Sequence, residues 1–314
     1  MSKFLKLPEE LDFIRAGRLS QKVSTESMDG KVCVITGTTS GVGYQAAIRL
    51  AKAGAKIVMI VRNKEKAESL CKELLALTPY PADYYLVDFT DLSQVRLATE
   101  AILSKYPHID VLINNAGLHI TTRQLTVDGY ETAFAVNHLA SFLITSLMLK
   151  TMVKSAPSRI IQVNSEGHRF NGLNINDLNW EKRRYNGYRG YGASKTAQLM
   201  TLWEFNDLLK DKGVTINAMH PGSVKSNIGT NNGKVYNLIS RYLIQPMLKS
   251  PVISGEAIYY LASATEMAGI SGKFFNLTNE EIPAPHSRNR VLGKEIFELS
   301  KKLVNLDKEN VYEI

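Results

Sequence analysis

Short apolar runs alternate with helical patterns from residue 31 onward, and this alternation constrains the fold more than any other feature. The apolar runs predict strands at residues 31–36, 57–61, 84–87, 111–113, 160–163, 214–218 and 273–275. The intervening patterns predict helices at 42–53, 64–77, 92–105, 130–154 and 191–210. Strands that alternate with helices form right-handed βαβ units. The sequence therefore predicts an α/β fold, a doubly wound parallel sheet with helices on both faces.

Nothing inside residues 30–280 resembles a linker, so we expect a single domain at 29–279 with short N- and C-terminal extensions. A chain of 314 residues can bury a large core without disulfides. In the extension 1–28, Leu7, Leu11 and Ile14 recur at helical spacing, which predicts a short helix. We expect this helix to pack on the main body rather than to bind a membrane or a partner. The extension 280–314 is predicted to be a helix ending at 303–305, followed by a polar tail.

The formal net charge of +8 is spread along the chain, except for the cluster Lys182-Arg183-Arg184. No basic stripe is interleaved with aromatic residues, so nucleic acid is not an expected partner. Attraction for an anionic cofactor or an acidic surface fits the charge better. No apolar run reaches 18 residues, and the N-terminus has no long apolar segment, so neither a spanning helix nor a secretion signal is predicted. We expect a cytoplasmic protein; membrane association remains open but is not expected.

The two cysteines of the chain give no sign of a disulfide or a metal site. Cys33 and Cys71 follow no disulfide or metal-binding spacing, and Cys33 lies in an apolar run typical of a buried free thiol. The economical interpretation is a reducing compartment, and no metal site is predicted.

A glycine-rich loop joins the first predicted strand to the first predicted helix. It contains Gly37, Gly41 and Gly43, and Thr39, Ser40 and Val42 lie between them. Glycines allow a tight turn and a close approach of backbone to ligand. The helix N-terminus offers unpaired N–H groups and a positive dipole to a pyrophosphate. Strand, loop and helix occur in the order that a dinucleotide site needs, so the sequence predicts one here.

Tyr191 and Lys195 stand four residues apart in a predicted helix, which places both side chains on one face. An ammonium group beside a phenol favours the phenolate, so we expect Lys195 to lower the pKa of Tyr191 from about 10. A phenol tuned in this way can exchange a proton near neutral pH. The pair alone is weak, because the same spacing also occurs on ordinary solvated helices.

Further motifs follow the predicted strands in order. Asn114-Asn115-Ala116-Gly117 follows the fourth strand, Asn137 lies in a helical tract, Ser165 ends the fifth strand, and Pro221-Gly222 follows the sixth. Together with the Gly-x-x-x-Gly-x-Gly loop and the tyrosine–lysine pair, they resemble the short-chain dehydrogenase/reductase family over roughly residues 30–280. The resemblance implies a single Rossmann domain that carries both cofactor-binding and catalytic residues.

The resemblance implies roles for four residues. Tyr191 would be the general acid in reduction and the general base in oxidation, and Lys195 would also hold the nicotinamide ribose. Ser165 would hydrogen-bond the substrate oxygen, and Asn137 would keep a water that bridges to the lysine. Many relatives have two serines after the fifth strand, whereas this chain has Asn164 before Ser165. Asn164 can still hydrogen-bond, so we expect an altered environment rather than loss of activity.

The end of the second strand predicts which nicotinamide cofactor is used. A carboxylate there would hold the 2′-hydroxyl of NAD, but the chain has Val61 and then Arg62, whose guanidinium suits a 2′-phosphate. We therefore expect NADP(H). A solvated loop arginine is the plain alternative. By resemblance, the remaining cofactor-binding residues are Asn63, Asp88, Phe89, Asn115, Ala116, Gly117, Pro221, Gly222, Val224 and Ser226, the last standing where relatives often have threonine.

The long segment between Ser165 and Tyr191 and the phrase Asn137-His138-Leu139 resemble the retinol dehydrogenase-like branch. His168 in this segment is expected to be structural. After Gly222, residues 225–250 are expected to cover the substrate, although a docking face for a membrane or another subunit would have the same composition. The apolar side chains of this lid are Tyr236, Leu238, Ile239, Tyr242, Leu243, Ile244 and Met247.

The sequence as a whole predicts an NADP(H)-dependent oxidoreductase that interconverts a lipophilic alcohol and its carbonyl. The alternative is a catalytically weak NADP-binding regulatory or scaffold protein. The expected partner is a small-molecule substrate, and family habit leaves a homodimer open.

Overall fold

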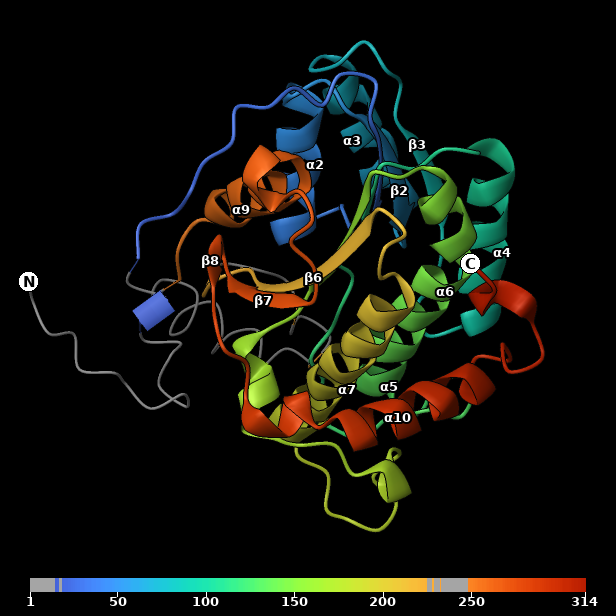
Figure 1. Ribbon diagram of the computed structural model, residues 1–314. Helices are drawn as coiled ribbons and strands as arrows, with labels where there is room; N and C mark the ends of the chain where they lie inside the picture. The colour runs from blue at the N-terminus through green and yellow to red at the C-terminus, as the bar shows by residue number, and fades with distance from the viewer. Residues whose placement is uncertain (1–14, 17–18, 225–227, 229–231, 233–247) are drawn as a thin grey trace, which may run out of the picture.

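An eight-stranded sheet runs through the centre of the molecule in the order β3-β2-β1-β4-β5-β6-β7-β8 (Figure 1). The computed structural model describes residues 15–16, 19–224, 228, 232 and 248–314. Neighbouring strands pair in parallel from β3 to β7, and β8 pairs antiparallel with β7. The strands are β1 (Val32–Thr36), β2 (Lys56–Val61), β3 (Asp83–Leu86), β4 (Val111–Asn114), β5 (Ser158–Val163), β6 (Val214–His220), β7 (Lys273–Asn276) and β8 (Asn279–Glu280).

Helices cover both faces of the sheet (Figure 1). One face carries α2 (Gly41–Lys52), α3 (Lys64–Leu75) and α9 (Val252–Ser263). The other carries α4 (Leu92–Lys105), α5 (Thr132–Phe134), the π-helical turn η2 (Ala135–Leu139), α6 (Ala140–Lys154), α7 (Gly187–Leu208) and α10 (Arg290–Leu303). Successive strand residues point to opposite faces, so Val34 packs in one core and Ile35 in the other. The doubly wound sheet predicted from the alternation is confirmed.

Short 3₁₀ turns complete the chain. They are η3 (Glu166–Phe170), η4 (Ile175–Asp177), η8 (Thr265–Met267), η9 (Pro285–Arg288) and η10 (Asn310–Tyr312). The C-terminal segment lies along α4 and α6 (Figure 1), where Tyr312 donates to Ser146 Oγ at 2.8 Å and Arg96 pairs with Glu309. Residues of the N-terminal extension pack on the opposite end of the sheet, because Lys22 N donates to Thr278 Oγ1. The chain after β8 and the chain before β1 thus both brace the domain.

Helix α9 was not predicted from the sequence. It is mostly apolar, because it packs against both α2 and the sheet, and its sequence shows no clear helical alternation of polar and apolar residues. It also contains Gly255, a poor helix former. A Cβ at Gly255 would lie 2.8 Å from the Gln45 backbone, so the glycine is what lets α9 approach α2. Packing rather than helix propensity determines this element.

The tract predicted as one helix at 130–154 is α5, η2 and α6 in succession. Among the described residues, Thr132–Lys154 is the one helix long and apolar enough to cross a membrane, and 94% of its most apolar window is buried inside the fold. It is a core helix. The predicted helix around residues 7–14, the lid side chains at 236–247 and Ser226 lie outside the described residues.

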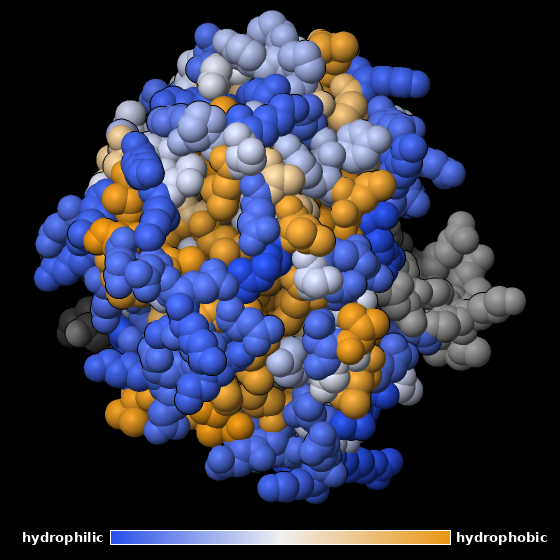
Figure 2. Space-filling view, turned by 90° about the vertical axis from the view of Figure 1, so that its right-hand side faces the viewer, coloured by the Kyte–Doolittle hydropathy of each residue, from blue (hydrophilic) through white to orange (hydrophobic). Residues whose placement is uncertain are grey.

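The surface beside α4 and the C-terminus is mixed in character. Figure 2 shows hydrophilic side chains surrounding several separate hydrophobic patches on this face. Apolar atoms supply more than half of the surface of ordinary folded proteins, so patches of this kind do not by themselves indicate a partner.

The packing of α9 on α2 gives a stability prediction. Gly255→Val places a branched side chain against the Gln45 backbone, so we expect the free energy of unfolding to fall by about 1–3 kcal/mol. Urea denaturation measures this change. Val252→Ala, at a half-exposed position of the same helix, is the control and should change stability far less. Equal losses of unfolding free energy in the two variants would contradict the close approach of α9 to α2 at Gly255.

Candidate active site

A cleft of about 650 Å³ opens at the carboxyl ends of the strands. Its centre lies where β1 pairs with both β2 and β4, the point at which the strand order reverses and ligands of such sheets bind. Nearly all of the site residues expected from the sequence line this cleft. They are Gly37, Thr39, Ser40, Gly41, Val42, Gly43, Arg62, Asn63, Asp88, Phe89, Asn115, Ala116, Gly117, Ser165, Tyr191, Lys195, Pro221, Gly222 and Val224.

The glycine loop at one end of the cleft requires its glycines. Gly37 and Gly41 have φ of +72° and +59°, a region that side chains disfavour. A Cβ at Gly43 would lie 2.3 Å from both Asn115 Nδ2 and the Gly37 carbonyl oxygen. The loop is therefore closed onto β4 with no room for a side chain at that point.

Asn115 and Thr36 fasten the loop. Asn115 Nδ2 donates to the carbonyl oxygens of Thr36 and Gly37, each at 2.9 Å. Thr36 Oγ1 in turn accepts from the backbone N–H groups of Asn115 and Ala116, each at 2.8 Å. These four bonds hold the ends of β1 and β4 in one fixed arrangement. The preorganised backbone is a property that a phosphate-binding loop needs.

The N-terminus of α2 lies at the same end of the cleft. Its N-cap, Ser40, makes no side-chain capping bond, and the first turn holds no acidic residue. The backbone N–H groups of the first turn and the positive end of the helix dipole are thus available to an anion. Together with the space kept by Gly37 and Gly43, these residues fit the pyrophosphate of a dinucleotide.

Arg62 and Asn63 lie at the end of β2, on the rim of the cleft, and both are exposed. Asn63 also caps α3, because its side chain accepts from Lys66 N. Lys66 lines the same rim, one turn beyond Arg62, and was not predicted from the sequence. Asp88 follows β3. Its Oδ1 accepts hydrogen bonds from the backbone N–H and the hydroxyl of Thr90. The rim beside Arg62 therefore carries two cations.

At the opposite end of the cleft, Tyr191 and Ser165 lie together. Two glycines allow this: a Cβ at Gly167 would lie 2.6 Å from the Tyr191 ring, and one at Gly192 would lie 2.7 Å from the Gly167 carbonyl oxygen. Helix α7 can therefore press against the turn that follows Ser165. Ser165 is the N-cap of η3, and its Oγ accepts from Gly167 N at 3.0 Å. The serine is thus both a helix cap and a cleft residue.

The expectation that Lys195 lowers the pKa of Tyr191 is wrong for this geometry. Burial raises the pKa of Tyr191 to about 12, and a hydrogen bond with Ser165 opposes the rise. Burial also lowers the pKa of Lys195 to about 7. The Lys195 Nζ lies 6.0 Å from the centre of the Tyr191 ring, and desolvation of the buried phenol is the dominant influence on its pKa. Tyr191 therefore holds its proton at neutral pH, which suits a donor to a carbonyl.

A buried polar network fixes Lys195. Its Nζ donates to the Val163 carbonyl oxygen at 2.9 Å and to Gln198 Oε1 at 3.4 Å. Asn164 Nδ2 donates to the Lys195 carbonyl oxygen and to Gln198 Oε1, so it ties the end of β5 to α7. The amide that stands in place of the usual serine is thus buried and hydrogen-bonded, and it also lines the cleft.

Asn137 lies beneath the cleft, fully buried in the π-helical turn. Its Oδ1 accepts from Leu118 N at 2.8 Å, and its Nδ2 donates to the Leu118 carbonyl oxygen and to Ser194 Oγ. Gln198 Nε2 donates to its main-chain oxygen. Single π turns often mark functional positions in helices. Here the turn anchors the strand end after β4 to α7.

Several cleft residues were not predicted from the sequence. His220 could have been found, since it directly precedes Pro221-Gly222. The apolar and aromatic residues at the mouth are held by tertiary packing and carry no sequence signal. Among the residues that the structure describes, these are Lys66, Thr90, Leu118, His119, Val136, Val163, Asn164, Phe170, Tyr188, His220, Ser223, Ile228 and Leu248.

His168 has the contacts of a structural residue. Its Nε2 accepts from Ala284 N at 3.0 Å, so its proton is on Nδ1, which donates to the Ser165 carbonyl oxygen at 2.7 Å. Burial lowers the pKa of His168 to about 3, which keeps the ring neutral. The histidine fastens the serine turn to the segment after β8.

Comparison with known proteins places this geometry in a family. Residues 31–236 match the family described as short chain dehydrogenase. Human retinol dehydrogenase 13 is 33% identical over 307 residues, covering 96% of this chain and 92% of that protein.

Two solved structures are similar. One is an uncharacterised protein from Mycobacterium paratuberculosis, with a TM-score of 0.71, 25% identity and coverage of 91% of this chain and 98% of that one. The other is a blue fluorescent protein from a metagenomic library in complex with NADPH, with a TM-score of 0.63, 25% identity and coverage of 82% and 100%. The relatives and the family match confirm the resemblance drawn from the motifs.

The buried ammonium of Lys195 predicts how stability changes with pH. The pKa of Lys195 is lower in the folded state, about 7, than in the unfolded chain, so between the two values only the unfolded chain binds this proton. The free energy of unfolding should therefore rise with pH from this group above pH 7, by roughly 1 kcal/mol per pH unit. Lys195→Met should lack this rise.

Chemical denaturation of wild type and Lys195→Met at pH 7, 8 and 9 measures the difference. The slope is the test, because the variant also loses the hydrogen bond to Val163 at every pH. Lys154→Met, at an exposed position, is the control and should follow the wild type. Parallel pH curves for wild type and Lys195→Met would contradict the prediction.

Proposed function

Since the chain belongs to the short-chain dehydrogenase family and to its retinol dehydrogenase-like branch, we propose that it is an NADP(H)-dependent oxidoreductase that interconverts a lipophilic alcohol and its carbonyl. One observation carries the proposal: Tyr191, Ser165 and Lys195 line the same cleft as the glycine loop. A proton donor and a dinucleotide-binding loop thus share one cavity. Family relatives and an NADPH complex of similar fold support it.

The residues divide the work of the reaction. A bound nicotinamide supplies or accepts hydride. Tyr191 gives its phenolic proton to the carbonyl oxygen in reduction and takes it back in oxidation. Ser165 Oγ, beside the phenol, orients the same oxygen by a hydrogen bond. Lys195 lines the cleft and places a positive charge there when protonated, and in a site shielded from water such a charge stabilises a developing alkoxide.

The phosphate end of the cleft supports NADP(H) rather than NAD(H). Arg62 and Lys66 lie on the rim of the cleft. At the position where NAD-type relatives carry a carboxylate, this chain has Val61. An arginine can hold a 2′-phosphate through paired N–H donors, and a lysine adds a second positive charge. Asn63 is neutral and its side chain caps α3, so it shapes the rim.

The mouth of the cleft supports a lipophilic substrate. Leu118, Phe170, Tyr188, Ile228 and Leu248 line it. Phe170 and Tyr188 are large and are 61% and 57% exposed, an arrangement that suits contact with an apolar molecule. Small hydrophilic sugars would find few polar partners there.

Replacing the phenol tests the chemistry. In Tyr191→Phe, we expect kcat for carbonyl reduction to fall by about 10²–10⁴-fold, since the proton donor is lost. NADPH binding, followed by fluorescence titration, should change little. Tyr80→Phe, outside the cleft lining, is the control. The assay is a screen of aldehydes, ketones and alcohols with both cofactors. Undiminished turnover in Tyr191→Phe would reject this mechanism, and NADPH binding without turnover in the wild type would favour a regulatory role.

Replacing the rim cations tests the cofactor. In Arg62→Ala, the KM for NADPH should rise about tenfold or more, because charge-assisted hydrogen bonds to the 2′-phosphate are lost, while the KM for NADH stays within about twofold. Lys66→Ala should shift the same ratio less. Lys64→Ala, exposed on the same helix but outside the cleft lining, is the matched control. Equal changes for both cofactors in Arg62→Ala would remove the assignment to NADP(H).

A further inference from the structure

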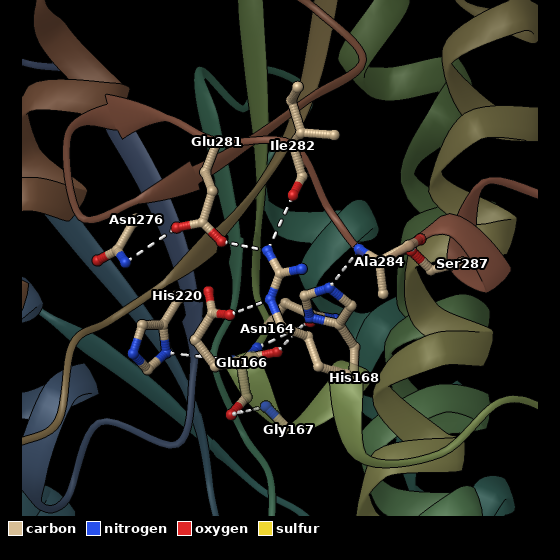
Figure 3. A network of polar contacts seen from close by, with 12 residues as sticks. Asn164, Glu166, Gly167, His168, His220, Asn276, Glu281, Ile282, Ala284 and Ser287 are labelled. Atoms are coloured by element: carbon tan, nitrogen blue, oxygen red, sulfur yellow. Dashed lines mark hydrogen bonds and ion pairs between the residues drawn. The ribbon is translucent and has the colours of Figure 1, made fainter. Parts of the chain in front are cut away.

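Two glutamates from distant parts of the chain meet behind Ser165. Glu166 directly follows Ser165 on η3, and Glu281 follows β8; Figure 3 shows both at the centre of a polar network. The side chain of Glu281 is 0% exposed and that of Glu166 is 20% exposed. Arg169 bridges them: its Nε donates to Glu166 Oε2 at 2.5 Å, and its Nη2 donates to Glu281 Oε1. One cation therefore serves two carboxyl groups.

Among the described residues, the other titratable groups around the pair are histidines. Burial lowers the pKa of His168 on η3 to about 3 and of His220 at the end of β6 to about 4. His220 Nδ1 accepts from Glu166 N at 3.4 Å, so it faces the pair as an acceptor. His286 on η9 contacts the carbonyl oxygen of His168 rather than either carboxyl group. With both glutamates ionised the cluster would carry one uncompensated negative charge, which burial disfavours.

Hydrogen bonding indicates which glutamate is the acid. Both oxygens of Glu281 accept bonds, Oε1 from Arg169 and Oε2 from Asn276 Nδ2 at 3.0 Å (Figure 3). Among the described residues, Glu166 Oε1 is buried without a donor. Burial and the charge of Glu281 raise the pKa of Glu166 to about 7, and a hydrogen bond between the two carboxyls adds to the rise. A proton on Glu166 makes the cluster neutral and replaces repulsion by a hydrogen bond.

The cluster also holds the turn that carries Ser165. Arg169 Nη2 donates to the Ile282 carbonyl oxygen at 2.8 Å, and His168 joins Ser165 to Ala284. The turn is thus clamped to the segment after β8 through residues on either side of Glu281. If both carboxyls were ionised, their repulsion would act on the residue next to Ser165.

We propose that Glu166 and Glu281 share one proton and that this shared proton holds Ser165 in register with Tyr191, which makes Glu166 a positioning residue for the reaction. The proposal rests on the proposed oxidoreductase function. Loss of the proton above about pH 7 moves the serine turn away from Glu281 and lowers turnover, while the phosphate end of the cleft keeps its affinity for NADPH.

The decisive variant is Glu166→Gln, because an amide donates to Glu281 and accepts from Arg169 at every pH. We expect the ratio of kcat/KM in Glu166→Gln to that in wild type to rise about tenfold or more between pH 6 and pH 8.5, since the wild type loses its proton and the variant cannot. Titrations of Lys195 or Tyr191 affect both proteins and cancel in this ratio. Glu280→Gln, the exposed neighbour, is the matched control and should keep the wild-type profile.

A second measurement needs no activity. Infrared difference spectra of the cofactor-free protein should show a protonated carboxyl group that disappears as the pH rises through about 7, present in wild type and Glu280→Gln and absent in Glu166→Gln. A band that persists in Glu166→Gln, or that is missing in wild type, would overturn the shared proton. A band as expected with an unchanged kcat/KM ratio would overturn the positioning role. Because the spectrum is independent of catalysis, failure of the oxidoreductase assignment remains distinguishable from failure of this proposal.

Discussion

The burial of Lys195 is the constraint on which the rest of the site depends. An ammonium group that is 2% exposed must be hydrogen-bonded, and the chain supplies the Val163 carbonyl at the end of β5 and the side chain of Gln198. Gln198 in turn reaches Asn164 and the main chain of Asn137, so one network joins β5, α7 and the π-helical turn. The same bonds that satisfy a costly buried charge fix the positions of the residues that line the cleft.

This network also explains what could be predicted from the sequence and what could not. The sheet and the phosphate loop follow from local patterns, namely apolar runs and the glycines at 37, 41 and 43, because those patterns act over a few residues. Helix α9 lacked such a pattern, since it packs on both α2 and the sheet and is therefore mostly apolar. The pKa of Tyr191 was predicted in the wrong direction because spacing along a helix reveals proximity to Lys195 but not depth of burial, and burial dominates here. His220 was missed although it directly precedes Pro221, and Lys66 was missed although it lies one turn beyond Arg62.

The extensions at the ends of the domain contribute to the site from a distance. The segment after β8 meets the serine turn through Glu281 and Ala284, while the segment beyond α10 lies on α4 and α6 through Glu309 and Tyr312. The contacts of Glu281 and Ala284 thus link the segment after β8 to the turn that carries Ser165, beside Tyr191. Cytoplasmic location and homodimerisation remain predictions of the sequence alone.

Charge balance near the reacting end of the cleft has a chemical consequence. His168 and His220 are neutral, and a proton shared by Glu166 and Glu281 neutralises their cluster with Arg169. Among the described residues there, Lys195 is then the charge left without a carboxylate partner. A single cation in a shielded cavity acts with little screening on an oxygen that gains negative charge. Ionisation of both glutamates would add a negative charge behind Ser165 and oppose the field of protonated Lys195. The shared proton therefore both positions Ser165 and preserves the positive field in the cleft.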